Sequence, residues 1–158
     1  MASDFLLELD GIKGESQDKT KGATIEVSSF SWGVQNHGTS SGGGGGGAAK
    51  ANFSDISFTC STNVASTSLF LRCANGKPVP KATLHVRKQG ETPQEYYTIT
   101  LTDCLVSSFQ ANGSGDVPHE SFSLNFAKVE FEYKPQKSDG SLDTAVKSGW
   151  NLKENVKV

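Results

Sequence analysis

A run of six consecutive glycines, residues 42–47, follows closely on a segment that is typical of a β-strand. Residues 21–34 are rich in the β-branched and aromatic side chains that favour extended structure. The glycines have no side chains to bury, and glycine loses more backbone entropy on ordering than any other residue. Residues 35–50 are therefore predicted to form a flexible arm, which is either a disordered insertion or a piece that gains order against another subunit.

The length and the charge of the chain restrict its class. With 158 residues, it is predicted to be a single domain spanning residues 1–158 that buries a core without staples. The formal net charge is -2, so no basic excess points to nucleic acid, and no cluster of lysine and arginine suggests a membrane surface. The short apolar run near the N-terminus contains acidic residues, which predicts neither a signal peptide nor membrane insertion. We therefore expect a protein that is cytoplasmic when made and that stays in the cytoplasm unless a dedicated machine exports it.

Three cysteines, Cys60, Cys73 and Cys104, are widely spaced. They show neither a CxxC motif nor the cysteine and histidine spacing of a zinc site. We expect reduced, mostly buried thiols and no metal.

Alternating apolar residues predict strands at 4–10, 22–34, 51–60, 81–89, 95–109 and 120–134. In two of these strands the apolar positions change parity, which requires an extra residue. β-Bulges are therefore predicted near Ser28 and Ser29 and near Ala127 and Lys128.

Two of the strands carry more detailed predictions. Strand 81–89 should direct Leu84 and Val86 into the core and His85 and Arg87 to the outside. Strand 95–109 is the longest alternation, with one apolar face predicted from its odd-numbered positions. These positions are Tyr97, Ile99, Leu101, Leu105 and Phe109.

One helix is predicted within residues 61–76. Ser66 is a suitable N-terminal cap, and Gly76 stands where a left-handed C-terminal cap belongs. Leu69, Phe70 and Cys73 share one face at helical spacing. Together with the strands, this helix predicts a mainly β fold: a single β-barrel of two packed sheets, with one short flanking α-helix and an extended glycine-rich arm.

Catalytic and cofactor motifs are not recognisable in the chain. His37, His85 and His119 are far apart in the sequence, with no HExxH, GxSxG or paired-carboxylate pattern beside them. The glycine run is not a phosphate-binding loop, because Lys50 is followed by Ala51 and a predicted strand instead of Ser or Thr and a helix. We therefore predict a protein that is not an enzyme and needs no cofactor.

The order of several short motifs resembles the haemolysin-coregulated protein (Hcp) family, which forms the tube of bacterial type VI secretion systems. The motifs are Gly11-Ile12, Gly14-Glu15-Ser16, Lys21-Gly22, IEVSSFSWGV (25–34), SLFLRCANGK (68–77), LVSSFQ (105–110), FSLNFAKVEFEY (122–133) and GWN (149–151). They cover essentially the whole chain. An arm of almost pure glycine departs from the family pattern and is expected to loosen the stacking of subunits.

The resemblance implies a homo-hexameric ring. It also implies that rings stack into a tube inside a contractile sheath, topped by a spike protein, and that the tube is exported without a signal peptide. Small effector proteins are the implied cargo. The arm is then expected to contact neighbouring subunits. Its candidate residues are Gln35, Asn36, His37, Gly42, Gly47 and Lys50.

A second hypothesis concerns polar strand faces. Ser29 and Ser31, with Thr98, Thr100 and Thr102, are candidates for the lining of a wet lumen, and an outer solvated face is the equal alternative. Two other functions remain open at this point. One is a phage-like tail tube, and the other is a monomeric β-barrel that binds a ligand in an apolar pocket.

Overall fold

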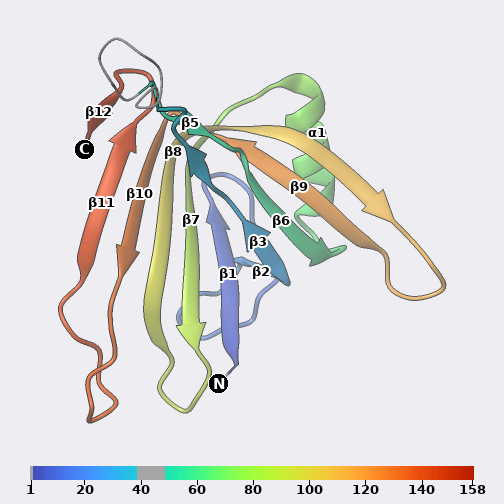
Figure 1. Ribbon diagram of the computed structural model, residues 1–158. Helices are drawn as coiled ribbons and strands as arrows, with labels where there is room; N and C mark the ends of the chain where they lie inside the picture. The colour runs from blue at the N-terminus through green and yellow to red at the C-terminus, as the bar shows by residue number, and fades with distance from the viewer. Residues whose placement is uncertain (1, 39–48) are drawn as a thin grey trace.

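The computed structural model describes residues 2–38 and 49–158 and is built mainly of strands, with one α-helix in these ranges (Figure 1). The strands are β1 (Ser3–Leu9), β2 (Ile25–Val27), β3 (Ser29–Ser31), β4 (Val34–Gln35), β5 (Asn52–Phe53), β6 (Ile56–Ser61), β7 (Val79–Lys88), β8 (Gln94–Asn112), β9 (His119–Asn125), β10 (Lys128–Tyr133), β11 (Val146–Asn151) and β12 (Val156–Lys157). The helix is α1 (Ser66–Asn75). The predicted mainly β class is confirmed.

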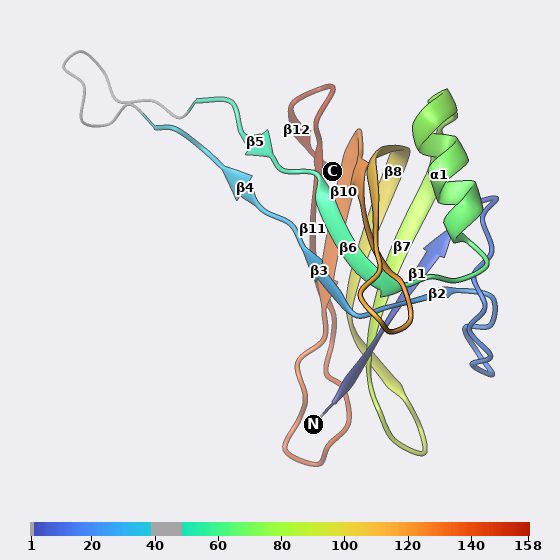
Figure 2. The same cartoon turned by 90° about the vertical axis from the view of Figure 1, so that its right-hand side faces the viewer.

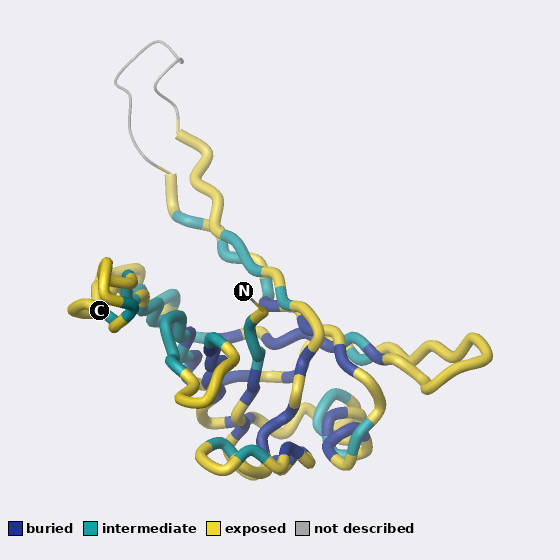
Figure 3. The backbone as a smooth tube through the Cα atoms, turned by 90° about the horizontal axis from the view of Figure 1, so that it is seen from below, coloured by how far each residue is buried: buried dark blue, intermediate teal, exposed yellow. Residues whose placement is uncertain are grey.

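Strand β8 connects two halves of the sheet. Its N-terminal half lies between β7 and β10, in the order β12-β11-β10-β8-β7-β1-β2. Its C-terminal half pairs with β9, which pairs with β6, which pairs with β3. All these pairings are antiparallel. The two halves curve around one core, and Figure 3 shows the buried segments gathered at the centre of the molecule.

The core is filled by aliphatic and aromatic side chains from both halves. Leu7, Leu84 and Ile99 come from the first half, and Phe58 and Phe122 come from the second. The two phenylalanine rings stack with their centroids 5.3 Å apart. Burial of side chains of this size contributes about 2 kcal/mol each. The interior is therefore a packed core and not a cavity.

The predicted β-barrel is not fully closed, because β2 does not pair with β6 in the described residues. Residues 25–27 pair with β1, whereas residues 29–31 pair with β6. Ser28 lies at the change of partner, where its N–H donates to the carbonyl of Thr59 at 2.7 Å. Ser29 is also the register partner of Thr59, so two residues face one, as predicted for a bulge. Before Ser28 the chain pairs with β1, and after it the chain pairs with β6.

The second change of parity falls where it was predicted, between β9 and β10. Phe126 and Val129 are both buried, and the chain leaves the strand geometry between them. On the facing strand, Asp103 has a φ of 54°. After it, Cys104 and Val106 point into the core and Leu105 is 42% exposed. The prediction that Leu105 shares one face with Ile99 and Leu101 is therefore wrong, because the left-handed residue shifts the alternation of β8.

The helix is shorter than the predicted range and packs against β8 (Figure 1). Gly76 is its left-handed C-cap, with a φ of 68° and an N–H bonded to the Arg72 carbonyl at 3.0 Å. Ser66 is not the N-cap; its hydroxyl accepts the Asn63 N–H and donates to the buried Glu120 carboxylate. Leu69 is fully buried and Cys73 partly so, but Phe70 is exposed, so the predicted apolar face is only partly correct.

Candidate functional site

The arm leaves the body as a short two-stranded ribbon of β4 and β5 (Figure 2). Gln35, Asn36, His37 and Lys50 are exposed on it. The amide of Asn36 donates to the Ala49 carbonyl at 2.5 Å, which ties the two sides of the ribbon together. Gly42 and Gly47, the other predicted arm residues, lie outside the described residues.

Aromatic side chains anchor the root of the arm to the sheet. The Trp32 ring lies 5.5 Å from that of Phe131, edge to face, and its indole N–H donates to the Tyr97 hydroxyl at 3.1 Å. The Phe53 and Phe126 rings are 6.3 Å apart. A shallow apolar hollow of about 190 Å³ lies between the arm root and β10–β11. These contacts fix the direction in which the arm leaves the body.

The outward face of the β3-β6-β9-β8 half is a wall of uncharged polar side chains. Strand register aligns them in two rows across the four strands. One row is Ser29, Thr59, Ser121 and Gln110, and the other is Ser31, Ser57, Ser123 and Ser108. Ser29 and Ser31, predicted as candidate lumen residues, are exposed members of this hydroxyl wall.

Hydrogen bonds join neighbouring side chains of the hydroxyl wall. The Ser29 and Thr59 oxygens are 2.5 Å apart, and those of Ser108 and Ser123 are 2.6 Å apart. The wall surrounds a shallow hollow of about 180 Å³ whose lining includes no charged residue. Because a hydroxyl group can donate or accept, such a surface offers hydrogen bonds of both kinds and no charge.

The three β8 threonines that were predicted to line the same lumen do not lie beside Ser29 and Ser31. Thr98, Thr100 and Thr102 are half-buried on the N-terminal half of β8, where the facing residues of β10 are Glu132, Glu130 and Lys128. Their sheet half packs its other face on the shared core. The threonines therefore do not belong to the hydroxyl wall, and their surroundings are charged.

His85 was predicted to point to solvent, but it is buried with 7% exposure. Its Nδ1 lies 2.5 Å from the Glu95 carboxylate and its Nε2 lies 3.2 Å from that of Glu8. Burial raises the pKa of Glu95, but the hydrogen bond and the charge of His85 outweigh it, so the pKa lies below its ordinary value. Both ring nitrogens are occupied by carboxylates, so His85 has no free nitrogen to act as a base.

Arg87, also predicted to face outward, is 4% exposed. Its guanidinium donates to both carboxylate oxygens of Asp18, at 3.1 and 2.7 Å, which holds the loop between β1 and β2 against β7. The hydrogen bond from Arg87 holds the pKa of Asp18 far below its usual range. These two predictions failed because the loop and the acidic side chains cover this face of β7.

A buried carboxylate beneath the helix was not predicted from the sequence. Glu120, 3% exposed at the start of β9, accepts the hydroxyls of Ser66 and Thr62. It thereby joins the start of α1 to the end of β6. The sequence feature closest to indicating this contact was the polar stretch 61–63 before the helix, because such residues favour capping interactions.

The remaining titratable groups form no recognisable catalytic or metal centre. Among the described residues, no three His, Cys, Asp or Glu side chains gather as metal ligands. All three cysteines are free; burial raises the pKa of Cys60 to about 11 and that of Cys104 to about 12. His37 and His119 are exposed on the arm and at the start of β9. In residues 2–38 and 49–158, no helix has the length and hydrophobicity needed to span a bilayer.

Comparison with known proteins decides the family. The family described as "Type VI secretion system effector, Hcp" matches residues 6–133. The chain belongs to the Hcp family. It is 45% identical over 160 residues to "Protein hcp1" of Pseudomonas aeruginosa, covering 99% of both chains.

Solved structures of type VI secretion proteins share the fold over nearly the whole chain. One, a type six secretion system protein, superposes with a TM-score of 0.92 at 30% identity, over 99% of this chain and 100% of the other. Hcp1 from Salmonella typhimurium gives a TM-score of 0.82 at 32% identity, over 100% of both. A type VI secretion system effector from Yersinia pestis gives 0.77 at 28% identity, over 94% and 99%. The family expected from the motifs is confirmed, and it is a family of structural and secreted proteins.

Proposed function

We propose that this Hcp protein is the structural subunit of a type VI secretion inner tube. Six copies form a ring, and rings stack into a tube inside the contractile sheath, beneath the spike protein. The protein is cytoplasmic when made and leaves through the machine, carrying small effectors in the lumen. The observation that carries this proposal is the hydroxyl wall: a broad uncharged face of a curved sheet, suited to line a wet channel.

The free edge beside the hydroxyl wall supports ring formation. Within residues 2–38 and 49–158, β3 pairs with β6 alone, so its other edge can accept a neighbouring subunit. A contact between two different surfaces of identical subunits closes into a ring when the rotation is suitable. A continuous lumen lining then arises from repetition of the same hydroxyl rows.

The arm supports the stacking of rings. It projects from the body and has exposed polar residues, including Gln35, Asn36, His37 and Lys50 (Figure 2). Its aromatic root is fixed, while Gly42 and Gly47 belong to a stretch whose composition makes ordering unfavourable. Each contact is therefore weak by itself, and stable tubes require many contacts acting together.

The first experiment is the native mass of the purified protein, with negative-stain images of the same fraction. We expect a mass of six chains and rings with an open centre. A monomer at every concentration, with and without the sheath and spike proteins, would contradict the proposal.

The lumen assignment is tested by Ser31→Arg, which places a long charged side chain in the hydroxyl wall. We expect intact rings that retain little of the effector that co-purifies with the wild type. Thr67→Arg, which introduces the same side chain at an exposed hydroxyl position of α1, is the control and should retain the effector normally. Equal retention by both variants would show that Ser31 does not line the lumen.

A monomeric ligand-binding barrel has no observation in its favour. The core is filled by residues such as Phe58 and Phe122, and the hollows in the described residues are open to the surface. A ligand site of that kind needs an enclosed apolar pocket. A phage-like tail tube would use the same architecture, but the family matched is that of type VI secretion.

A further inference from the structure

Two stretches of the chain have the same tripeptide, Ala-Asn-Gly, at residues 74–76 and 111–113. An asparagine side chain loses ammonia most readily when glycine follows it, because glycine has no side chain to keep its nitrogen away from the neighbouring carboxamide. These are the two Asn-Gly pairs of the sequence. Since the residues on both sides of the asparagine are identical, the fold decides which of the two reacts.

The reaction, deamidation, needs only water. The backbone nitrogen of the glycine bonds to the side-chain carbonyl carbon of the asparagine and loses its proton. The bond from that carbon to the amide nitrogen breaks, and ammonia leaves behind a cyclic imide. Water then adds to one of the imide carbonyls, the ring C–N bond breaks, and aspartate or isoaspartate results. One water is consumed and one ammonia is released, so no oxidant, reductant or enzyme is required.

Asn75, at the end of α1, is protected by hydrogen bonds. The Gly76 N–H, which would have to attack, donates to the Arg72 carbonyl at 3.0 Å. The carboxamide oxygen of Asn75 accepts the Lys77 N–H at 2.9 Å. Both bonds must break, and Gly76 must leave its φ of 68°, before the nitrogen can reach the side chain. The capped end of the helix therefore opposes the reaction.

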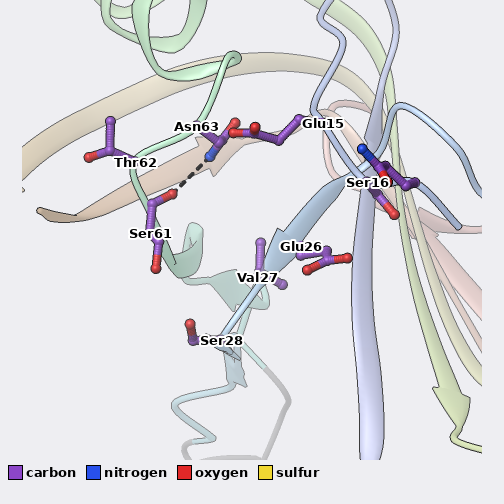
Figure 4. A pocket seen from close by; sticks show the side chains of 9 residues that line it. Glu15, Ser16, Glu26, Val27, Ser28, Ser61, Thr62 and Asn63 are labelled. Atoms are coloured by element: carbon purple, nitrogen blue, oxygen red, sulfur yellow. Dashed lines mark hydrogen bonds between the residues drawn. The ribbon is translucent and has the colours of Figure 1, made fainter. Parts of the chain in front are cut away.

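Asn63 shows another way in which an asparagine is held. Its amide donates to the Ser61 carbonyl at 3.0 Å, as Figure 4 shows at the edge of an open hollow, and its oxygen accepts the Ala65 N–H at 2.9 Å. The residue after it is Val64, whose branched side chain hinders attack by the nitrogen. Asn63 therefore has neither a mobile carboxamide nor a glycine after it.

Asn112 lacks these restraints. It is the exposed last residue of β8, and its register partner is His119, the first residue of β9. No hydrogen bond of the Asn112 side chain or of the Gly113 N–H is found in residues 2–38 and 49–158. Gly113 has open space around it, in a hairpin that projects from the body (Figure 1). Only the terminal pair of the ladder has to open before the attack, and the ends of ladders open most easily.

The side chain of Asn112 shares the face of the hydroxyl wall. Ser108 and Gln110 of β8 belong to the wall, and alternate residues of a strand share a face, so Asn112 is the next member of this series. On β9, His119 follows Ser121 in the same way. A carboxylate in place of the carboxamide therefore adds a negative charge to a face whose two rows are uncharged.

We propose that Asn112 is a site of spontaneous deamidation in the folded protein, and that Asn75 is protected from this reaction. Each modified chain gains one negative charge at the β8–β9 end of the hydroxyl wall, opposite His119. The charge of this face therefore changes with the age of the protein. The reaction does not depend on ring or tube formation.

The test follows both sites in the intact protein in its native assembly, incubated at neutral and at mildly alkaline pH. Peptide mapping by mass spectrometry should show a gain of about one dalton at Asn112, at least about tenfold faster than at Asn75. The rate should rise with pH, because the attacking nitrogen must lose its proton. During incubation in water enriched in heavy oxygen, the new carboxylate should take up the label, which excludes modification during digestion.

The unfolded chain is the control for the sequence. In guanidinium chloride, Asn75 and Asn112 lie in the same tripeptide without the helix cap or the strand. Their rates should then agree within about twofold. The difference between the two sites in the native protein is therefore the contribution of the fold.

Three variants test the chemistry at Asn112. Gly113→Ala places a methyl group beside the attacking nitrogen, in open space, and should slow the reaction about tenfold in a folded protein. Val117→Ala, an exposed change in the same turn, is the matched control and should react like the wild type. Asn112→Asp has the charge of the product, so it should elute with the modified wild type on anion exchange and gain no mass at this position.

Three results would each overturn the proposal. They are equal rates at Asn75 and Asn112 in the folded protein, an unmodified Asn112 after the unfolded chain has reacted, and an unchanged rate in Gly113→Ala. If Gly113→Ala failed to fold, the comparison of the two wild-type sites would decide. A protein that is modified at Asn112 but forms no ring would reject the proposed tube function and leave this site intact.

Discussion

At the scale of single residues, close backbone contacts decide which positions tolerate change. Gly14 is buried in the loop before β2, and a Cβ built on it would lie 2.3 Å from the Thr24 carbonyl oxygen. We expect Gly14→Ala to lower the free energy of unfolding by at least about 2 kcal/mol, because backbone must move to accept the methyl group. Gly113→Ala, at a position with open space around it, is the matched control. Urea denaturation of both variants checks this, and equal midpoints would contradict it.

The Arg87–Asp18 pair predicts how stability depends on pH. The pKa of Asp18 is lower in the folded protein than in the unfolded chain, so its stabilisation is complete above the unfolded pKa and is lost as the pH falls toward the folded value. Asp18→Asn should therefore unfold at lower urea concentration than the wild type at pH 7, and the gap should narrow below about pH 4. Asp116→Asn, on the exposed β8–β9 turn, should behave like the wild type. A gap that is independent of pH would disprove the ionic origin.

Residue positions that depend on distant partners were the ones that the sequence could not predict. The alternation of strand 81–89 correctly placed Leu84 and Val86, because it is a local property. It placed His85 and Arg87 wrongly, because their burial depends on Glu8, Glu95 and Asp18, which the fold brings together. Nothing local in a strand shows that carboxylates from other elements will cover its second face.

At the scale of elements, α1 shows the same limit. Its end was predictable, because Gly76 adopts the left-handed conformation that a C-cap requires. Its start was not, because Ser66 bonds to Glu120, which is 54 residues away in the sequence. The side of the helix that packs was only partly predictable, since Leu69 and Phe70 are neighbours with opposite surroundings.

The two neighbours provide a direct test of the helix packing. Leu69→Ala should reduce the free energy of unfolding by about 3 kcal/mol, because Leu69 is completely buried in the core. Phe70→Ala should reduce it by about 1 kcal/mol or less, since Phe70 is 59% exposed and its ring lies 6.3 Å from that of Phe109. Chemical denaturation measures both. A larger loss of unfolding free energy for Phe70→Ala than for Leu69→Ala would contradict this orientation of the helix.

At the scale of the whole molecule, the arm carries a prediction about assembly. Deletion of residues 42–47 should leave rings intact and abolish tubes, because the shortened arm cannot reach beyond its own ring. Replacing the six glycines with six serines keeps the length and should preserve tubes. Negative-stain imaging distinguishes the outcomes. Normal tubes from the deletion variant would show that the arm does not connect rings.

The overall architecture was predictable in class but not in closure. Strand alternation and turns indicated a mainly β fold with one helix, since these signals are local. Whether the sheet closes depends on the partners of β2 and β3, and the chain changes partner at Ser28. The predicted bulge at Ser28 and Ser29 was therefore correct, while its consequence, an unclosed sheet beside Glu26, was not foreseen.

The sharing of β8 between both halves of the sheet has a thermodynamic consequence. Separating β8 from β7 and β10, or from β9, exposes the same core, because both halves of the sheet pack on it. Since a single 19-residue strand takes part in both, neither half has a complete sheet of its own. The chain should therefore unfold as one cooperative unit, with no state in which one half of the sheet is native and the other is unfolded.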